Sequence, residues 1–378
     1  MIPRLSLTAP LLFLMTPPAV AEQTNAPEAP KTAVTLKTVA KGLENPWALE
    51  FLPDGRMLVT EKAGRLRVVA KDGTLGDPIS GVPEVVSENQ AGLLDVALAP
   101  DYLDSGRIYF SYSEPREGGA NATSLARARL VLDGDNGKLE DLSVIFRQEP
   151  AFKSFHHFGS RIAFADDGTL FLTTGERNIA RQESQNPANT VGKVIHITGD
   201  GAAAADNPKI DGWDPKVWSI GHRNVQGAAI DPATGKLWTL EHGPQGGDEL
   251  NQPEAGKNYG WPIIIYGKEY SGSPVGEGIT SKPGLEQPVY YWNPSIATSS
   301  LTFYTGDLFP GWKGSILVGA LKYMHVQRLV MKDGKVIAQE ILADDIGERV
   351  RDVKQGPDGA IYLVTDDANG RIVRMAPQ

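Results

Sequence analysis

Apolar and polar residues alternate along much of the chain, in short runs that end at turns rich in Asp and Gly. A period of two predicts β-strands with one buried face, and Pro-Asp-Gly between two such runs is the chemistry of a tight turn. No window sustains an apolar stripe of helical period. The alternation returns in clear units at 48–69, 92–113, 161–177, 227–243 and 351–374, with a weaker unit at 314–337.

These repeats predict one architecture for the whole chain. Internal repeats that each supply roughly four strands are typical of a β-propeller. We therefore expect an all-β fold, a six-bladed β-propeller of four-stranded antiparallel sheets, as a single domain at 34–378. Residues 34–43 could add the outer strand of the last blade and close the ring. The alternative, a pair of β-sandwiches, would not explain repeats throughout the chain.

The first 33 residues have a different character. Arg4 precedes an apolar run, and Ala19-Val20-Ala21 forms a small-x-small cleavage site. This pattern predicts a secretory signal peptide at 1–21, and the Pro- and Ala-rich stretch after it predicts a flexible leader at 22–33. The chain has no cysteine, which is compatible with export, and no other window apolar enough to span a membrane. We expect a periplasmic protein, either a monomer or a homodimer.

Charge and motifs exclude several classes of function. The chain carries 46 acidic and 37 basic residues, a formal net charge of −9, without a basic block, so it is a poor candidate for binding nucleic acid. It has no Gly-x-Ser-x-Gly elbow, nucleotide-binding loop or zinc spacing, which removes the commonest hydrolase, kinase and nicotinamide-enzyme interpretations. Because the chain is acidic overall, a cluster of cations within it is evidence for a binding site rather than for general surface charge.

The segment 221–262 is the densest in candidate chemistry. Burying many polar groups is costly unless each has a partner, so the segment is either a solvated loop or the lining of a site. Its glycines and aromatic residues favour a site, because glycine lets the backbone approach a ligand closely. The polar residues are Arg223, Asn224, Gln226, His242, Asp248, Glu249 and Asn251.

A pair of histidines lies at the entry to another repeat. Adjacent residues of an extended chain point to opposite sides, so His156 and His157 are a poor metal pair. We expect one of them to be packed and the other to face a cavity. A structural histidine is the alternative at any single position.

Four cations lie near the ends of repeat strands. Arg349 and Arg351 share one strand face, Lys322 ends an apolar run, and Arg223 belongs to the polar segment. Surface solvation explains any one of them. Together they predict a basic pocket for a small polyanion, since Arg and Lys suit carboxylates.

The run from His242 to Glu249 is a candidate calcium site. Calcium takes six to eight oxygen ligands, and a glycine-rich turn exposes backbone carbonyls beside two acids. A solvated turn is the alternative. By contrast, 132–141 only imitates a calcium loop, because Gly137 falls one position too early, and we interpret it as a hairpin turn.

These segments resemble the quinoprotein glucose/sorbosone dehydrogenase family, and most closely its soluble periplasmic PQQ-dependent aldose sugar dehydrogenases. The resemblance runs from about Leu43 to Arg374, and the order of its motifs makes it specific. The motifs are NPWALEFLPDG, NQAGLLDVALAPDY, HHFGSR, GHRNVQG, EHGPQGGDELN, GKNYGWP, ILVGALK and RVRDV.

The resemblance implies a six-bladed propeller that holds pyrroloquinoline quinone (PQQ), a tricarboxylate, over its channel together with Ca²⁺. Carried over by motif, the residues that hold or line PQQ are Gln90, Asn224, Tyr270, Lys322, Arg349 and Arg351. The carbonyls of Gly243 and Pro244 would bind the calcium that touches PQQ. Glu249 and the carbonyl of Tyr259 would form a second, structural calcium site.

The resemblance also implies a mechanism. His157 matches the family's general base and would take the proton of the sugar's anomeric hydroxyl while hydride leaves C1 for PQQ. Calcium and Arg223 would stabilise the charge that arrives on the quinone. The product would be an aldonolactone, and an external acceptor (quinone, dye or cytochrome) would receive the electrons.

One residue departs from the family pattern. Where soluble glucose dehydrogenases have an acid before the catalytic histidine, this chain has His156, so a broad aldose range is a safer expectation than glucose alone. A calcium-dependent propeller lactonase or hydrolase is one alternative function, and the cations argue against it. A non-catalytic propeller that binds sugar or protein is another, in which His157 would be dispensable.

Overall fold

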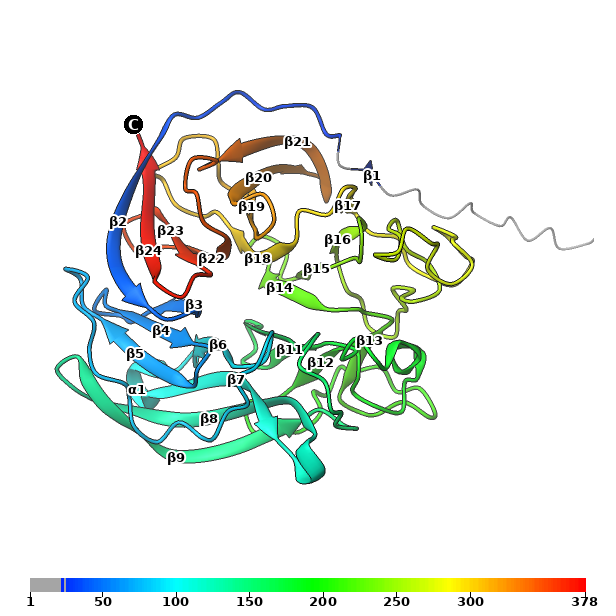
Figure 1. The fold of residues 1–378 in the computed structure, drawn as a ribbon, viewed down its shortest axis with the longest axis horizontal. Coiled ribbons are helices and arrows are strands. Elements are labelled where there is room, and N and C mark those ends of the chain that lie inside the picture. Colours follow the sequence, from blue (N-terminus) through cyan, green and yellow to red (C-terminus); the bar gives the residue numbers. More distant parts are fainter. Residues whose placement is uncertain (1–21, 24) are drawn as a thin grey trace, which may run out of the picture.

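Six sheets surround a central axis in the computed structural model, which describes residues 22, 23 and 25–378 (Figure 1). Each sheet is one blade, and one edge strand of each blade lies next to the centre, where these innermost strands contact one another around the ring. This is the predicted all-β, six-bladed β-propeller. The predicted signal peptide at 1–21 lies outside the described residues.

The blades follow one another in chain order. Blade 1 contains β3 (Pro46–Phe51), β4 (Met57–Glu61) and β5 (Arg65–Val69). Blade 2 contains β6 (Leu93–Leu98), β7 (Arg107–Pro115), β8 (Asn121–Asp133) and β9 (Asn136–Arg147). Blade 3 contains β10 (Gly159–Phe164), β11 (Leu170–Thr174), β12 (Lys193–Ile197) and β13 (Val217–Ile220).

The second half of the ring has the same plan. Blade 4 contains β14 (Val225–Ile230), β15 (Leu237–Glu241), β16 (Asp248–Asn251) and β17 (Tyr290–Trp292), with β1 (Glu22–Gln23) pairing in parallel with β17. Blade 5 contains β18 (Thr298–Phe303), β19 (Ile316–Ala320), β20 (His325–Lys332) and β21 (Lys335–Leu342). Blade 6 contains β22 (Val350–Gln355), β23 (Ile361–Thr365), β24 (Gly370–Pro377) and β2 (Val34–Leu43).

Strand β2 closes the ring. It comes from the N-terminal part of the chain and pairs antiparallel with β24 near the C-terminus, which confirms the role predicted for 34–43 (Figure 1). Blade 1 differs from the prediction in having a sheet of three strands. Residues 75–79 run beside β5 in place of a fourth strand, and they pair with it only at isolated points, such as the bond from the Gly76 amide to the Val68 carbonyl (2.8 Å).

The turns between strands have the chemistry that the sequence predicts. In Pro53-Asp54-Gly55, the Asp54 carboxylate accepts a hydrogen bond from the Arg56 amide (2.9 Å), and Gly55 has a positive φ of 88°. The helices of the described residues are short: α1 (Tyr102–Ser105), η1 (Glu117–Gly119) and η2 (Arg181–Gln185). No helix in the described part of the chain is long and apolar enough to cross a membrane.

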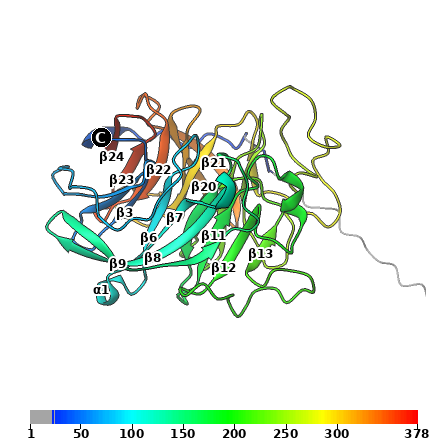
Figure 2. The same cartoon turned by 60° about the horizontal axis from the view of Figure 1, so that its bottom comes forward.

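Apolar side chains fill the space between blades. The tilted view shows strands of neighbouring blades stacked beside one another (Figure 2). Between blades 1 and 2, for example, Trp47 and Leu66 pack with Phe110 and Tyr112 in one buried cluster. Because each blade buries its faces against two neighbours, the ring forms one cooperative structure that fixes the ends of its innermost strands.

The segment predicted as a flexible leader contacts blade 5. The Ala29 amide donates to the Gln339 carbonyl (2.8 Å), the Gln339 amide donates to the Pro27 carbonyl (2.9 Å), and Ala29 is buried. This pairing is not predicted by the Pro- and Ala-rich composition.

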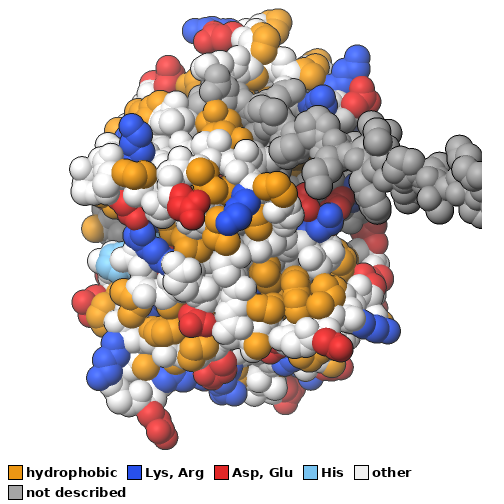
Figure 3. All heavy atoms as spheres, turned by 90° about the vertical axis from the view of Figure 1, so that its right-hand side faces the viewer, with side chains coloured by type: hydrophobic (Ala, Val, Ile, Leu, Met, Phe, Trp, Pro, Cys, Tyr) orange, Lys and Arg blue, Asp and Glu red, His pale blue; other side chains and the backbone are white. Residues whose placement is uncertain are grey.

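On the side of the molecule shown in Figure 3, acidic and basic side chains are interspersed, as suits an acidic protein without a basic block.

Candidate active site

The innermost strand of every blade begins with a β-bulge. The shifts in register lie between Pro46 and Ala48, Leu93 and Val96, Gly159 and Ile162, Val225 and Gly227, Thr298 and Leu301, and Val350 and Asp352. A bulge bends a strand and re-aims its side chains. Within these shifts lie Trp47, Leu94, Gln226 and Arg351, and all four side chains line one cavity of about 240 Å³ at the mouth of the channel.

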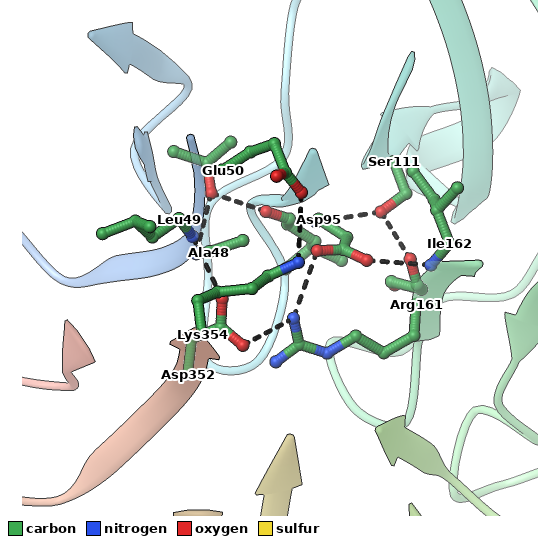
Figure 4. Close-up of polar contacts among 12 residues, drawn as sticks. Ala48, Leu49, Glu50, Asp95, Ser111, Arg161, Ile162, Asp352 and Lys354 are labelled. Carbon is green, nitrogen blue, oxygen red and sulfur yellow. Dashed lines mark hydrogen bonds and ion pairs between the residues drawn. The ribbon is translucent and has the colours of Figure 1, made fainter. Parts of the chain in front are cut away.

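Arg161 fills the centre of the ring next to this cavity. It belongs to the bulge of blade 3, is only 4% exposed, and contacts the innermost strand of every other blade. Its guanidinium pairs with the carboxylates of Asp95 and Asp352 (3.1 Å each; Figure 4). It lies over the Trp47 ring, 4.2 Å from the ring centroid. It also donates to the carbonyls of Gln226 (2.7 Å) and Ser299 (2.8 Å). A single cation thus ties all six blades under the site.

The cavity carries a surplus of positive charge. Lys62, Arg349 and Arg351 line it, and Asp366 is the one acidic side chain among its described lining residues. Arg351 pairs with Asp366 at 2.6 Å, and Arg349 contacts it at 3.4 Å. Burial alone would raise the pKa of Asp366, but Arg351, Arg349 and Lys62 lower it to about 2. The Nε of Arg351 is buried without a partner, so the arrangement leaves donor capacity for an anion.

A buried histidine–carboxylate pair flanks the cavity. The Nδ1 of His157 lies 2.7 Å from Oε1 of Glu176, and the His157 amide donates to Oε1 of Gln90 (2.8 Å), which lines the cavity. Burial and the nearby charge of Arg223 hold the pKa of His157 well below its ordinary value, and burial raises the pKa of Glu176 to about 7. Among the described residues, the ring has no hydrogen-bond partner except at Nδ1, so Nε2 of a neutral imidazole is available as a base.

Arg223 and Asn224 connect this pair to blade 4. The Arg223 guanidinium donates to two successive carbonyls, those of His242 and Gly243 (3.1 Å each), and lies 5.2 Å from the Trp261 ring centroid. Oδ1 of Asn224 accepts from the Gly159 amide (3.1 Å), next to the histidine loop. The turn that follows β15 therefore presents its carbonyls to a positive group.

Blade 4 also contains a pair of buried carboxylates. Glu241 and Glu249 are buried, and their carboxylates each accept a hydrogen bond from Nδ2 of Asn251 (3.1 Å). Burial and the charge of Glu241 raise the pKa of Glu249 well above its ordinary range. The Oδ1 of Asn251 is buried without a partner. Two buried carboxylates beside an unpartnered carbonyl oxygen are a donor set that suits a hard cation such as calcium.

Comparisons with known proteins agree with this geometry. The family model described as Glucose / Sorbosone dehydrogenase matches residues 43–374. The chain belongs to this family. It is 42% identical over 354 residues to aldose sugar dehydrogenase YliI of Escherichia coli, a match that covers 93% of this chain and 94% of the relative.

Two solved structures show the same family likeness. The soluble aldose sugar dehydrogenase of Escherichia coli in its apo form superposes with a TM-score of 0.87 at 41% identity, covering 92% of this chain and 100% of that one. The PQQ-bound form of an aldose sugar dehydrogenase from Streptomyces coelicolor superposes with a TM-score of 0.77 at 29% identity, covering 93% and 100%.

The structure brings most of the residues predicted from the family motifs together. Gln90, Arg349 and Arg351 line the cavity, and His157, Arg223 and Asn224 adjoin it through the contacts described above. Gly243 and Glu249 lie in blade 4, at the carbonyl-bearing turn and the buried carboxylate pair described above, and Pro244 follows Gly243 directly. Tyr259 is buried and stacks on His222, whose Nδ1 lies 3.0 Å from Glu241.

Two predicted residues are not brought into the cavity. Tyr270 is 76% exposed, in the long connection between β16 and β17, and it is absent from the described lining. Lys322 is exposed in the turn after β19, where Nζ lies 5.1 Å from the Tyr323 ring centroid, although the adjacent Leu321 lines the cavity. Tyr270 is a surface side chain of a long connection and Lys322 one of a short turn, and the motifs alone do not place either of them.

Sequence reasoning missed Lys62, Leu321, Asp366 and Glu176, and it named His242 only as part of the polar segment and of the candidate calcium run. Lys62, His242, Leu321 and Asp366 each follow directly after the second strand of a blade, and all four line the cavity. Aligning the repeats on that strand end would therefore have found Lys62 and Asp366 as candidates. Glu176 follows the second strand of blade 3 by one further residue, which is the corresponding signal for the partner of His157.

Proposed function

We propose that the chain is a quinoprotein that oxidises aldose sugars at C1 to aldonolactones, with PQQ as its cofactor and Ca²⁺ bound. The observation that carries this proposal is the cation-rich cavity at the bulged strand ends beside the buried pair of His157 and Glu176. The names of the relatives support it, since one is an aldose sugar dehydrogenase and another was solved in its PQQ-bound form.

The donor set fits a tricarboxylate quinone. Arg349 and Arg351 would hold its carboxylates, and the unpartnered Nε of Arg351 is a donor that lacks an acceptor until such a ligand binds. Gln90 and Asn224 would add polar contacts, while Lys322 would reach in from the rim and Tyr270 from the connection between β16 and β17. The bound quinone supplies the acceptor for the electron pair that leaves the sugar as hydride.

His157 is the proposed general base. Its Nδ1–H donates to Glu176, which fixes the tautomer and the ring, so Nε2 can accept the proton of the anomeric hydroxyl. Help of this kind is typically worth about 10²- to 10⁴-fold in rate. Arg223 would stabilise negative charge that develops beside it, because its guanidinium is held by two carbonyls and keeps its unpartnered Nε buried.

Calcium is proposed at two places. The carbonyls of Gly243 and Pro244 would hold one ion, which would share the Gly243 carbonyl with Arg223 and add Lewis-acid stabilisation to the site. Glu249 and the carbonyl of Tyr259 would hold a structural ion, with the buried Oδ1 of Asn251 available beside them.

The remaining predictions concern the setting of the enzyme. We propose a periplasmic protein that is exported by residues 1–21, acts as a monomer or homodimer, and passes electrons to an external quinone, dye or cytochrome. His156, whose ring centroid lies 6.5 Å from that of His157, replaces the acid of the glucose enzymes, which favours a broad range of aldoses.

Reconstitution tests the proposal. Purified apoprotein is supplied with PQQ and calcium, and dye reduction is followed with several aldoses, with samples lacking either PQQ or sugar as controls. The proposal predicts turnover that requires both. Turnover of lactones without PQQ would instead support the calcium-dependent lactonase, and no turnover at all would leave a binding propeller.

His157→Ala separates chemistry from binding. We expect this variant to lose turnover by about 10²-fold or more while it still binds PQQ. A variant that loses PQQ but keeps normal turnover in the reconstituted fraction would contradict the role proposed for His157.

A further inference from the structure

Lys62 is a cation of the cavity that neither the family motifs nor the repeats assigned. We propose that Lys62 is a further cofactor-binding residue, which holds a carboxylate of the quinone from the side of blade 1. This inference rests on the proposed function, because it concerns the same cavity and the same ligand.

The backbone places Lys62 firmly at the cavity. It follows directly after β4, and both of its peptide groups are bonded: its amide donates to the Asn45 carbonyl (3.1 Å), and its carbonyl accepts from the Leu93 amide (3.1 Å). The side chain therefore starts from a fixed point between blades 1 and 2. It extends into the lining of the cavity, where it is half-buried.

The Nζ of Lys62 is steered by the turn that carries Gln90. Nζ donates to the carbonyl of Asn89, whose left-handed backbone (φ 55°) turns that carbonyl toward the ammonium. The next residue, Gln90, accepts from the His157 amide through its side chain and donates from its own amide to the Phe155 carbonyl (3.0 Å). Lys62 thus lies in one hydrogen-bonded chain with the loop of the proposed base. An ammonium has three donors, and a carbonyl uses one of them, so donors remain for a ligand.

The charges around Lys62 favour an added anion. Burial lowers the pKa of Lys62; Asp366 opposes this effect, while Arg351 and Arg349 lower the pKa further. Three cations therefore share a single carboxylate in the described lining. A bound carboxylate would relieve the repulsion among them, and the more carboxylates a ligand carries, the more completely it would do so. A tricarboxylate matches this surplus better than a neutral sugar does.

Apoprotein titration with PQQ tests the proposal. The mature protein is titrated at fixed calcium and two salt concentrations, and the dissociation constant is read from quenching of tryptophan fluorescence, since Trp47 lines the cavity. Lys62→Met keeps the aliphatic stem and removes the charge, Lys62→Arg keeps the charge, and Lys138→Met is a matched control. Lys138 is exposed on β9, where it pairs with Glu140.

The expected results follow from the loss of one charge-assisted contact. Lys62→Met should weaken PQQ binding by about tenfold or more and reduce its dependence on salt. Lys62→Arg should bind within about threefold of the unaltered protein, which would show that the methionine variant fails through lost charge. Lys138→Met should bind as the unaltered protein does.

Two outcomes overturn the inference in distinguishable ways. If the unaltered protein binds PQQ and Lys62→Met binds it equally well with the same salt dependence, then Lys62 does not hold the cofactor and the proposed function survives. If the unaltered protein does not bind PQQ at all, the proposed function fails and the inference fails with it.

Discussion

Arg161→Met should destabilise the whole ring. Arg161 is almost fully buried and pairs with Asp95 and Asp352, so its loss leaves two buried carboxylates without their shared cation. The same change removes the hydrogen bonds to carbonyls of blades 4 and 5. Lys354 lies near these two carboxylates (Figure 4). It already pairs with Glu50 at 3.1 Å, so it can replace only part of the lost positive charge.

The magnitude follows from the burial of this network. Breaking a buried ion pair by removing one partner typically costs about 3–5 kcal/mol. An unfolding entropy of about 2.1 cal/mol/K per residue gives roughly 0.7 kcal/mol/K for a propeller of this size, so Tm should fall by about 4–7 °C. Because Arg161 contacts Trp47 and Gln226, both of which line the cavity, we also expect weaker retention of the cofactor.

Differential scanning calorimetry of apoprotein variants measures this effect. Arg129→Met is the matched control, since Arg129 is 45% exposed on β8 and pairs with Glu140 and Asp141 at the surface, where such pairs are worth about 1 kcal/mol or less. Adding Asp95→Asn to Arg161→Met should recover part of the loss, because one uncompensated charge is removed. An Arg161→Met variant that melts within a degree of the control would refute the reasoning.

Four further outcomes follow from the site. Burial and Arg223 lower the pKa of His157, so its imidazole should stay neutral below pH 6.5, and the acid limb of kcat should instead follow protonation of Glu176, whose pKa burial raises to about 7; a kcat that stays level down to pH 5 would contradict this. Glu176→Ala should reduce kcat by about 10²-fold while PQQ affinity is retained, as steady-state kinetics and fluorescence titration would show, and an unchanged kcat would remove Glu176 as the residue that orients the base. Arg351→Ala should weaken PQQ binding by about tenfold or more, and equal affinity would exclude it from the site. Calcium at 100 times its dissociation constant should stabilise the protein by about 2.7 kcal/mol, and Glu249→Gln should abolish most of this gain in thermal melts; an equal gain in the variant would place the ion elsewhere.

Much of the fold follows from local pattern in the sequence. Alternation and the Pro-Asp-Gly turns predict strands, and their recurrence predicts six blades because a strand repeat must bury both faces of each sheet. The closing role of residues 34–43 was predictable for the same reason. The incomplete blade 1 was not, since residues 75–79 pair with β5 only at isolated points and leave no alternation to detect.

The site was predictable only where a motif or a strand end marks it. The family motifs identify His157 and Arg351, but the bulges that aim Trp47 and Gln226 at one cavity depend on register between strands, which no local pattern encodes. The tautomer of His157 also depends on a tertiary contact, because its partner Glu176 lies 19 residues away in the sequence. Arg161 appeared in a motif, yet its contact with all six blades exists only once the ring has closed.

A structure of the protein crystallised with PQQ and calcium tests the central claim most directly. The account predicts the quinone in the cavity at the bulged strand ends, with its carboxylates within hydrogen-bonding distance of Lys62, Arg349 and Arg351 and with His157 beside it. A quinone bound elsewhere on the propeller, or this cavity filled only by water at saturating PQQ, would contradict the account.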